Sequence, residues 1–119
     1  MDQMRKDRLI EAGVDVNQAL ERFLDSEAML ERFLGKFLSD TNYAKLCQAV
    51  EAQDWEGALA AAHTLKGMCG NLSMNRLFSL FTRQVSALRG GDLAGAKALM
   101  EEIVPAYDAA AAAIRGDAL

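Results

Sequence analysis

Apolar residues recur at intervals of three and four along this chain, and that spacing restricts what it can fold into. The clearest run lies between residues 27 and 38, where the apolar positions are Met29, Leu30, Phe33, Leu34, Phe37 and Leu38. Such spacing places the residues on one face of an α-helix, whereas a half-buried strand would alternate apolar and polar residues. No stretch alternates in that way, and good helix formers such as Ala, Leu and Glu dominate. We therefore predict an all-α fold.

Breaks between the apolar runs divide the chain into helices that we expect at 4–12, 16–24, 27–38, 41–52, 55–71, 74–88 and 93–114. Side chains that can accept a backbone hydrogen bond stand at the expected N-caps: Asp15, Ser26, Asp40 or Thr41, Asp54 and Asp92. Gly90-Gly91 is the clearest turn. Pro105 removes a backbone bond inside the last segment, so we expect a kink or short break there.

The only histidine, His63, lies midway along segment 55–71. If Leu65 is at the centre of the buried face, His63 points roughly 160° away from it, toward solvent. Gly67 lies one turn after His63 on the same side, and Gly70 lies two turns after. Each glycine inside a helix costs about 0.5–1 kcal/mol relative to alanine, without a packing return on a solvent face. We infer that these glycines leave the imidazole open to close approach.

Lys66 follows His63 by three residues and lies on the same side of the helix. Its ammonium would reduce the electrostatic cost of a phosphoryl group on the imidazole. An exposed imidazole with a cleared approach and a nearby cation is suited to carrying such a group.

The stretch Ala61-Ala62-His63-Thr64-Leu65-Lys66-Gly67-Met68-Cys69-Gly70-Asn71-Leu72 resembles the phosphoacceptor segment of histidine-containing phosphotransfer (HPt) domains. The stretch from Gly13 to Phe37 also resembles the opening of many free-standing members. The resemblance implies one domain over residues 1–119, with fraying at 1–3 and 115–119. It also implies an up-down antiparallel four-helix bundle with short accessory N-terminal helices. That family usually has glycine where this chain has Ser73, which we expect to cap the following helix.

The resemblance implies that His63 exchanges a phosphoryl group with aspartates of response-regulator receiver domains, in a relay that a hybrid sensor histidine kinase supplies. We expect Leu59, Ala60 and Gly70 to contact the partner. The chain would be a phosphocarrier rather than an enzyme, because the receiver would supply the Mg²⁺ and the reacting aspartate. No cofactor is then expected on this chain, which we expect to be a cytoplasmic monomer.

Gln84 falls inside the apolar stripe of segment 74–88, where an unpaired amide is expensive to bury. It could hydrogen-bond the ring nitrogen of His63 that does not take the phosphoryl group. In many relatives a polar residue on the same helix does this, at a position that corresponds to Val85 here. A structural Gln84 that bonds to backbone is the alternative.

Charge and composition exclude several other classes of protein. The chain has a net charge of −4, which argues against nucleic-acid binding. It has no apolar run long enough to cross a bilayer and a charged opening rather than a secretory leader. One histidine, with Cys47 and Cys69 far apart, does not predict a metal site. We expect both cysteines to be buried free thiols.

Two alternatives to a free-standing phosphocarrier stay open. The chain could be a helical interaction module that is not phosphorylated and whose glycine-lined face binds a partner helix. It could also be the phosphoacceptor domain of a larger chemotaxis-type kinase. The absence of a linker favours a free-standing protein.

Overall fold

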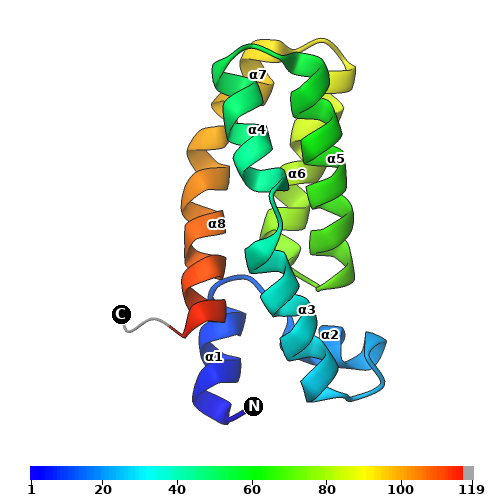
Figure 1. Ribbon diagram of the computed structural model, residues 1–119, viewed down its shortest axis with the longest axis vertical. Helices are drawn as coiled ribbons and strands as arrows, with labels where there is room; N and C mark the ends of the chain where they lie inside the picture. Colours follow the sequence, from blue (N-terminus) through cyan, green and yellow to red (C-terminus); the bar gives the residue numbers. More distant parts are fainter. Residues whose placement is uncertain (117–119) are drawn as a thin grey trace.

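The computed structural model describes residues 1–116, and these fold into helices joined by short connections (Figure 1). The helices are α1 (Gln3–Glu11), α2 (Val16–Arg22), α3 (Glu27–Ser39), α4 (Asn42–Glu51), α5 (Trp55–Asn71), α6 (Asn75–Arg89), α7 (Leu93–Ala98) and α8 (Met100–Arg115). The described residues form no strand, and an isolated bridge joins Val14 to Met74. The prediction of an all-α fold is confirmed.

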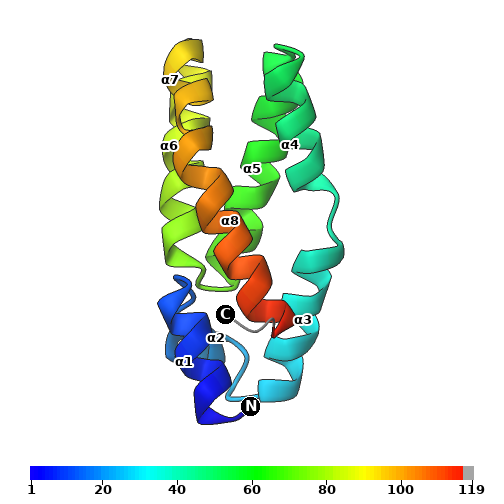
Figure 2. The same cartoon turned by 90° about the vertical axis from the view of Figure 1, so that its left-hand side faces the viewer.

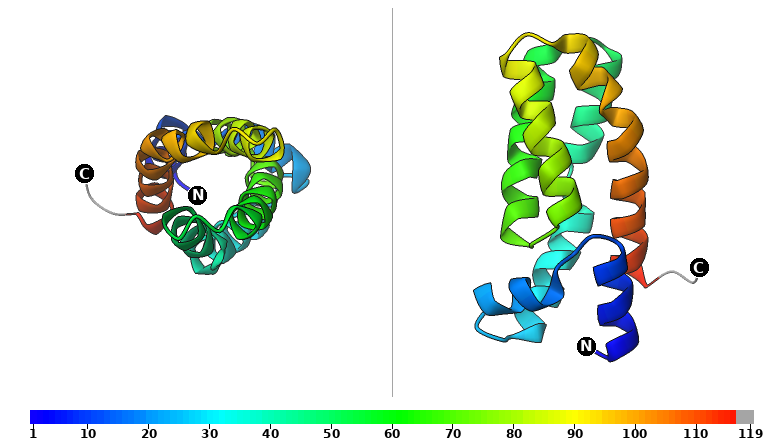
Figure 3. Two further views of the ribbon diagram at one scale, coloured as in Figure 1. Left: turned by 90° about the horizontal axis from the view of Figure 1, so that it is seen from above. Right: turned by 180° about the vertical axis from the view of Figure 1, so that it is seen from behind.

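The longer helices form a ring around a common core. Helix α5 packs against α4 on one side and α6 on the other, and α8 packs against both α6 and α3. The view along the long axis shows this ring, and the side views show α3 below α4 and α7 above α8 (Figures 2 and 3). Tyr43 of α4 stacks on Tyr107 of α8, with ring centroids 3.6 Å apart, and so closes the ring.

The core contains most of the residues that the apolar spacing predicts. Leu30, Leu34 and Phe37 of α3 are buried, and so are Leu77, Leu80, Phe81 and Leu88 of α6. Met29 is an exception because it is exposed at the edge of the α3 stripe. The two cysteines are free thiols, of which Cys69 is buried and Cys47 half-buried. Burial raises the pKa of the Cys69 thiol to about 12.

Predicted N-caps fix where α2, α3, α5 and α7 begin. The carboxylates of Asp15, Asp54 and Asp92 accept hydrogen bonds from the backbone N–H groups of Gln18, Gly57 and Gly95, and the Ser26 hydroxyl accepts from Met29 N–H. At α4 one of the two expected residues, Thr41, occupies the cap position, but its side chain makes no cap bond. The Asp40 carboxylate accepts from the Asn42 N–H at 2.8 Å.

The break that we expected at Pro105 lies elsewhere. Pro105 is inside α8, and the interruption falls at Leu99, between α7 and α8. Leu99 keeps helical backbone angles, and its carbonyl accepts from both Glu102 and Ile103 N–H. A proline removes the bond to the carbonyl four residues earlier and crowds it. The helix nevertheless continues through Pro105, and the interruption lies six residues before it.

Polar contacts attach the N-terminal helices to the bundle. Arg5 of α1 binds the Glu31 carboxylate through two nitrogens at 2.7 Å and donates to the carbonyls of Ala113 and Ile114 at the end of α8. The Asp15 N–H donates to the Ser73 carbonyl, beside the Val14–Met74 bridge. Asp2 caps α1. Fraying of residues 1–3 and 115–116 stays a prediction, and residues 117–119 lie outside the described part of the chain.

Candidate functional site

His63 lies midway along α5 and is exposed. The opposite face of α5 is buried and consists mostly of small residues, with Leu65 at 1% exposure near its centre. Asp54 caps the first turn of this helix through Gly57. His63 therefore lies on the solvent-facing side of α5, whose opposite face packs on the core. This agrees with the position predicted from the angular spacing of residues in an α-helix.

The space around Gly67 is open. A Cβ atom built on Gly67 would meet no heavy atom within 4 Å. Because Gly67 lies one turn from His63 on the exposed side, nothing in the described structure blocks approach to the imidazole from that direction.

Gly70 differs from Gly67. A Cβ atom on Gly70 would lie 3.1 Å from the ring of Phe78, which belongs to α6 and is itself 38% exposed. Gly70 therefore allows the ring of Phe78 to lie close to α5. It is partly buried against this ring, in contrast to the open position of Gly67. Phe78 is a residue near the site that the sequence reasoning missed, because it lies outside the apolar stripe of α6.

The other predicted site residues flank His63 at different depths. Lys66 is half-buried, and no carboxylate of the described residues lies within ion-pair distance of it. Leu59 is half-buried against the core, whereas Ala60 is exposed. The Thr64 hydroxyl donates to the Ala60 carbonyl at 3.1 Å, so its hydrogen is directed to its own helix.

Gln84 does not bond to His63 in the structure, and that suggested role is corrected. Its side chain is fully buried, and its amide nitrogen donates to the Ala96 carbonyl of α7 at 3.1 Å and lies 3.1 Å from the Met100 sulfur. Its amide oxygen has no hydrogen-bond partner among residues 1–116. The structure shows the alternative reading, in which Gln84 joins α6 to the backbone of α7.

Ser73 does not cap α6, contrary to the prediction. Met74 occupies the cap position, and Ser73 is buried with φ = 53° in the left-handed region. That backbone conformation favours glycine. The Ser73 hydroxyl instead accepts a hydrogen bond from Arg22 at 2.9 Å, and the same guanidinium nitrogen donates to the Gly70 carbonyl. Arg22 thus connects α2 to the end of the helix that carries His63.

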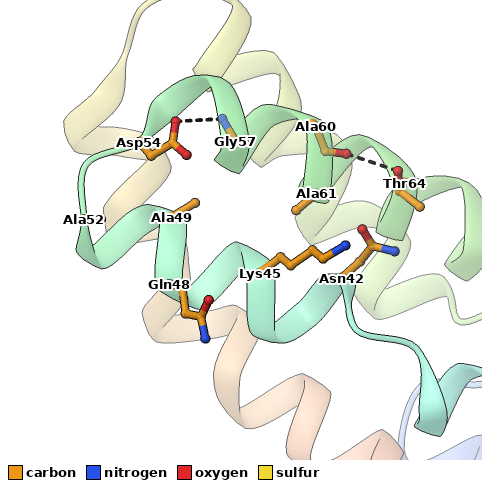
Figure 4. A pocket seen from close by; sticks show the side chains of 10 residues that line it. All are labelled: Asn42, Lys45, Gln48, Ala49, Ala52, Asp54, Gly57, Ala60, Ala61 and Thr64. Atoms are coloured by element: carbon orange, nitrogen blue, oxygen red, sulfur yellow. Dashed lines mark hydrogen bonds between the residues drawn. The ribbon is translucent and has the colours of Figure 1, made fainter.

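A groove of about 510 Å³ lies between α4 and α5 (Figure 4). Its α5 wall includes Ala60 and Thr64, the neighbours of the histidine, and its α4 wall includes Lys45. The sequence reasoning missed Lys45, because one exposed lysine on another helix has no local signal that relates it to His63.

The described residues contain no group of three or more His, Cys, Asp or Glu side chains that could hold a metal ion. Within residues 1–116, none of the helices is both long and apolar enough to cross a bilayer.

The family model of the Hpt domain matches residues 15–115, which is most of the chain and includes His63, Lys66 and Gly67. No curated protein and no solved structure matches the chain.

Proposed function

The chain belongs to the Hpt domain family, whose members transfer phosphoryl groups through a histidine in phosphorelays, and we propose that His63 is the residue that carries the group here. The observation that supports this most directly is that the only histidine of the chain is exposed on a well-anchored helix with open space at Gly67. A partner domain can reach such a side chain without a change in this fold.

The proposed step is an exchange between a receiver aspartate and His63. The lone pair of an imidazole nitrogen attacks the phosphorus, and the bond between phosphorus and the aspartyl oxygen breaks. The carboxylate leaves with that electron pair, while the other ring nitrogen keeps its proton. The reverse step passes the group to the aspartate of another receiver. Such a reaction depends on positioning and charge neutralisation.

Members of the family are phosphotransfer carriers rather than classical enzymes. We propose that the receiver supplies the catalysis, with Mg²⁺ held in its acidic pocket, and that this chain needs no cofactor of its own. Lys66 would neutralise part of the charge of the phosphoryl group. Leu59, Ala60 and Gly70 would lie under the docked receiver, with the open side at Gly67 as its path to the imidazole.

We further propose that a hybrid sensor histidine kinase supplies the relay and that the chain acts as a cytoplasmic monomer. Residues 1–119 would form one domain. Its architecture would be an up-down four-helix bundle of α3–α4, α5, α6 and α7–α8, with α1 and α2 as accessory helices.

His63→Gln tests the proposal. The variant should lose phosphoryl uptake both from a phosphorylated receiver and from phosphoramidate, a small phosphodonor that needs no partner. Its melting temperature should stay close to that of the wild type, because an exposed residue opposite the core has little packing energy. The label on the wild type should be labile to acid and stable to base.

Thr64→Ala is the matched control, since it alters an exposed neighbour on the same helix and should keep the label. Retained labelling in His63→Gln would place the acceptor elsewhere. A wild type that takes no label from phosphoramidate or from any receiver would favour the alternative of an interaction module that is not phosphorylated.

A further inference from the structure

The groove between α4 and α5 contains side-chain hydrogen-bond donors that an incoming carboxylate could use. Its lining includes one ammonium group, from Lys45, and the amide side chains of Asn42 and Gln48. The carboxylate in the lining, that of Asp54, is already engaged, because it accepts the Gly57 N–H at 3.0 Å. Figure 4 shows the Lys45 side chain extending along the groove toward Asn42 and Thr64.

Lys45 has no ion partner in the described structure. It is exposed, and none of the carboxylates of residues 1–116 lies within ion-pair distance of its ammonium. The α5 wall opposite it is built from small residues, among them Gly57, Ala60 and Ala61. The cation is therefore accessible to a side chain that enters from outside.

The groove and Lys66 lie on opposite sides of His63. Thr64 is turned about 100° from His63 around the axis of α5, toward α4, while Lys66 is turned about 60° the other way. A partner centred on the imidazole would thus meet a cation on each side, from two different helices.

The whole chain carries a net charge of −4, so an acidic partner is repelled unless cations lie near the contact. Resting on the proposed function, in which the partner is a receiver with an acidic pocket, we propose that Lys45 is a docking residue that binds a carboxylate of the incoming receiver in the α4–α5 groove. Lys45 then affects how fast the receiver binds and how it is oriented on this chain, whereas Lys66 neutralises part of the charge of the phosphoryl group.

This division of roles gives a test with two phosphodonors. Lys45→Gln should raise the receiver concentration needed for half-maximal transfer by about threefold to tenfold at low ionic strength. Lys45→Glu should raise it further, and Lys45→Arg should restore it. Labelling by phosphoramidate and the lifetime of the phosphohistidine should equal those of the wild type, because neither involves a docked protein.

Lys97→Gln is the matched control, since it removes the same charge from an exposed position on α7 outside the groove. It should change the half-maximal concentration by less than about twofold, and the effect of Lys45→Gln should fade as salt is raised. If Lys45→Gln and Lys97→Gln had equal effects, Lys45 would act only through the net charge of the chain, and the proposal would be overturned.

A shorter phosphohistidine lifetime in Lys45→Gln would also overturn it, by placing the ammonium on the phosphoryl group. Failure of the proposed function would look different, because the wild type would then take no label from phosphoramidate on His63. Normal labelling, with receiver transfer indifferent to the charge at position 45, would remove the docking role alone.

Discussion

Gly67 and Gly70 look alike in the sequence, and their different surroundings in the structure lead to different predictions. Gly67→Gln should stabilise the protein by up to about 1 kcal/mol, because glycine is the poorer helix former and its Cβ has open space. It should also slow transfer from a receiver, since a long side chain would stand one turn from His63. Urea unfolding and transfer rates on the same preparation measure both effects.

Gly70→Ala serves as the comparison for Gly67→Ala. The new methyl group at position 70 would lie 3.1 Å from the Phe78 ring, which must move to accept it. The gain in stability should therefore be smaller at position 70 than at position 67. If Gly67→Gln lowered both stability and transfer, Gly67 would be packed against a neighbour and the open approach to His63 would be wrong.

Lys66→Ala should shorten the lifetime of the phosphohistidine or slow transfer severalfold, while leaving the fold intact. The charge that the ammonium faces exists only after phosphorylation, and the partly exposed site limits the effect to about 1 kcal/mol. The decay of label is measured at low and at high salt, and the difference from the wild type should shrink as salt rises. An unchanged lifetime at low salt would leave Lys66 as a solubilising residue.

The rotation of about 100° per residue in an α-helix was enough to predict the exposure of His63 and its position opposite Leu65, because both residues belong to the same helix. The partners of Gln84 and Ser73 could not be predicted in this way. Gln84 bonds to α7, which is adjacent to it only after the chain folds back. The conformation of Ser73 belongs to a turn whose backbone angles have no marker in the side chain itself.

At the level of single helices, α8 contains a proline, Pro105, that lowers its stability. Pro105→Ala should stabilise the protein by about 1–3 kcal/mol, because alanine restores the N–H that can donate to the Glu101 carbonyl. Pro105 is exposed, so the change removes little packing. Chemical denaturation measures the effect, with Val104→Ala as a neighbouring exposed substitution that should have a smaller one. A loss of stability would contradict this prediction.

Helix boundaries were predictable where a side chain caps the helix. Asp15, Ser26, Asp54 and Asp92 each accept the expected backbone hydrogen bond. The interruption at Leu99 was not predictable in the same way. The sequence marks the proline, whereas the interruption lies at Leu99, which is buried and has no local sequence signal of a break.

At the level of the whole molecule, Arg5 joins three helices. Arg5→Ala should destabilise the protein by about 1–2 kcal/mol, because it breaks a paired contact with Glu31 and leaves two carbonyls at the end of α8 without this donor. Arg32→Ala, an exposed arginine on α3, is the matched control and should have little effect. Equal midpoints of urea unfolding for both variants would show that α1 is only loosely attached.

Sequence reasoning predicted the all-α class and the longer helices, since each of these follows from local spacing and capping. It did not predict how α1 docks, because the Arg5 contacts join residues that lie 26 to 109 positions apart. The family match begins at residue 15, so α1 lies outside the part of the chain that the family describes.

The contact between Arg22 and Ser73 limits the order in which this sequence can have changed. Serine in the left-handed conformation costs about 1–2 kcal/mol where glycine, usual in the family, costs little, and the bond from Arg22 offsets part of that. Because Arg22 also donates to the Gly70 carbonyl, the arginine is useful with either residue at position 73. A lineage that acquires Arg22 first can exchange the glycine afterwards with little loss. One that exchanges the glycine first passes through a less stable ancestor, so serine at position 73 should occur together with Arg22, whereas glycine there should not depend on it.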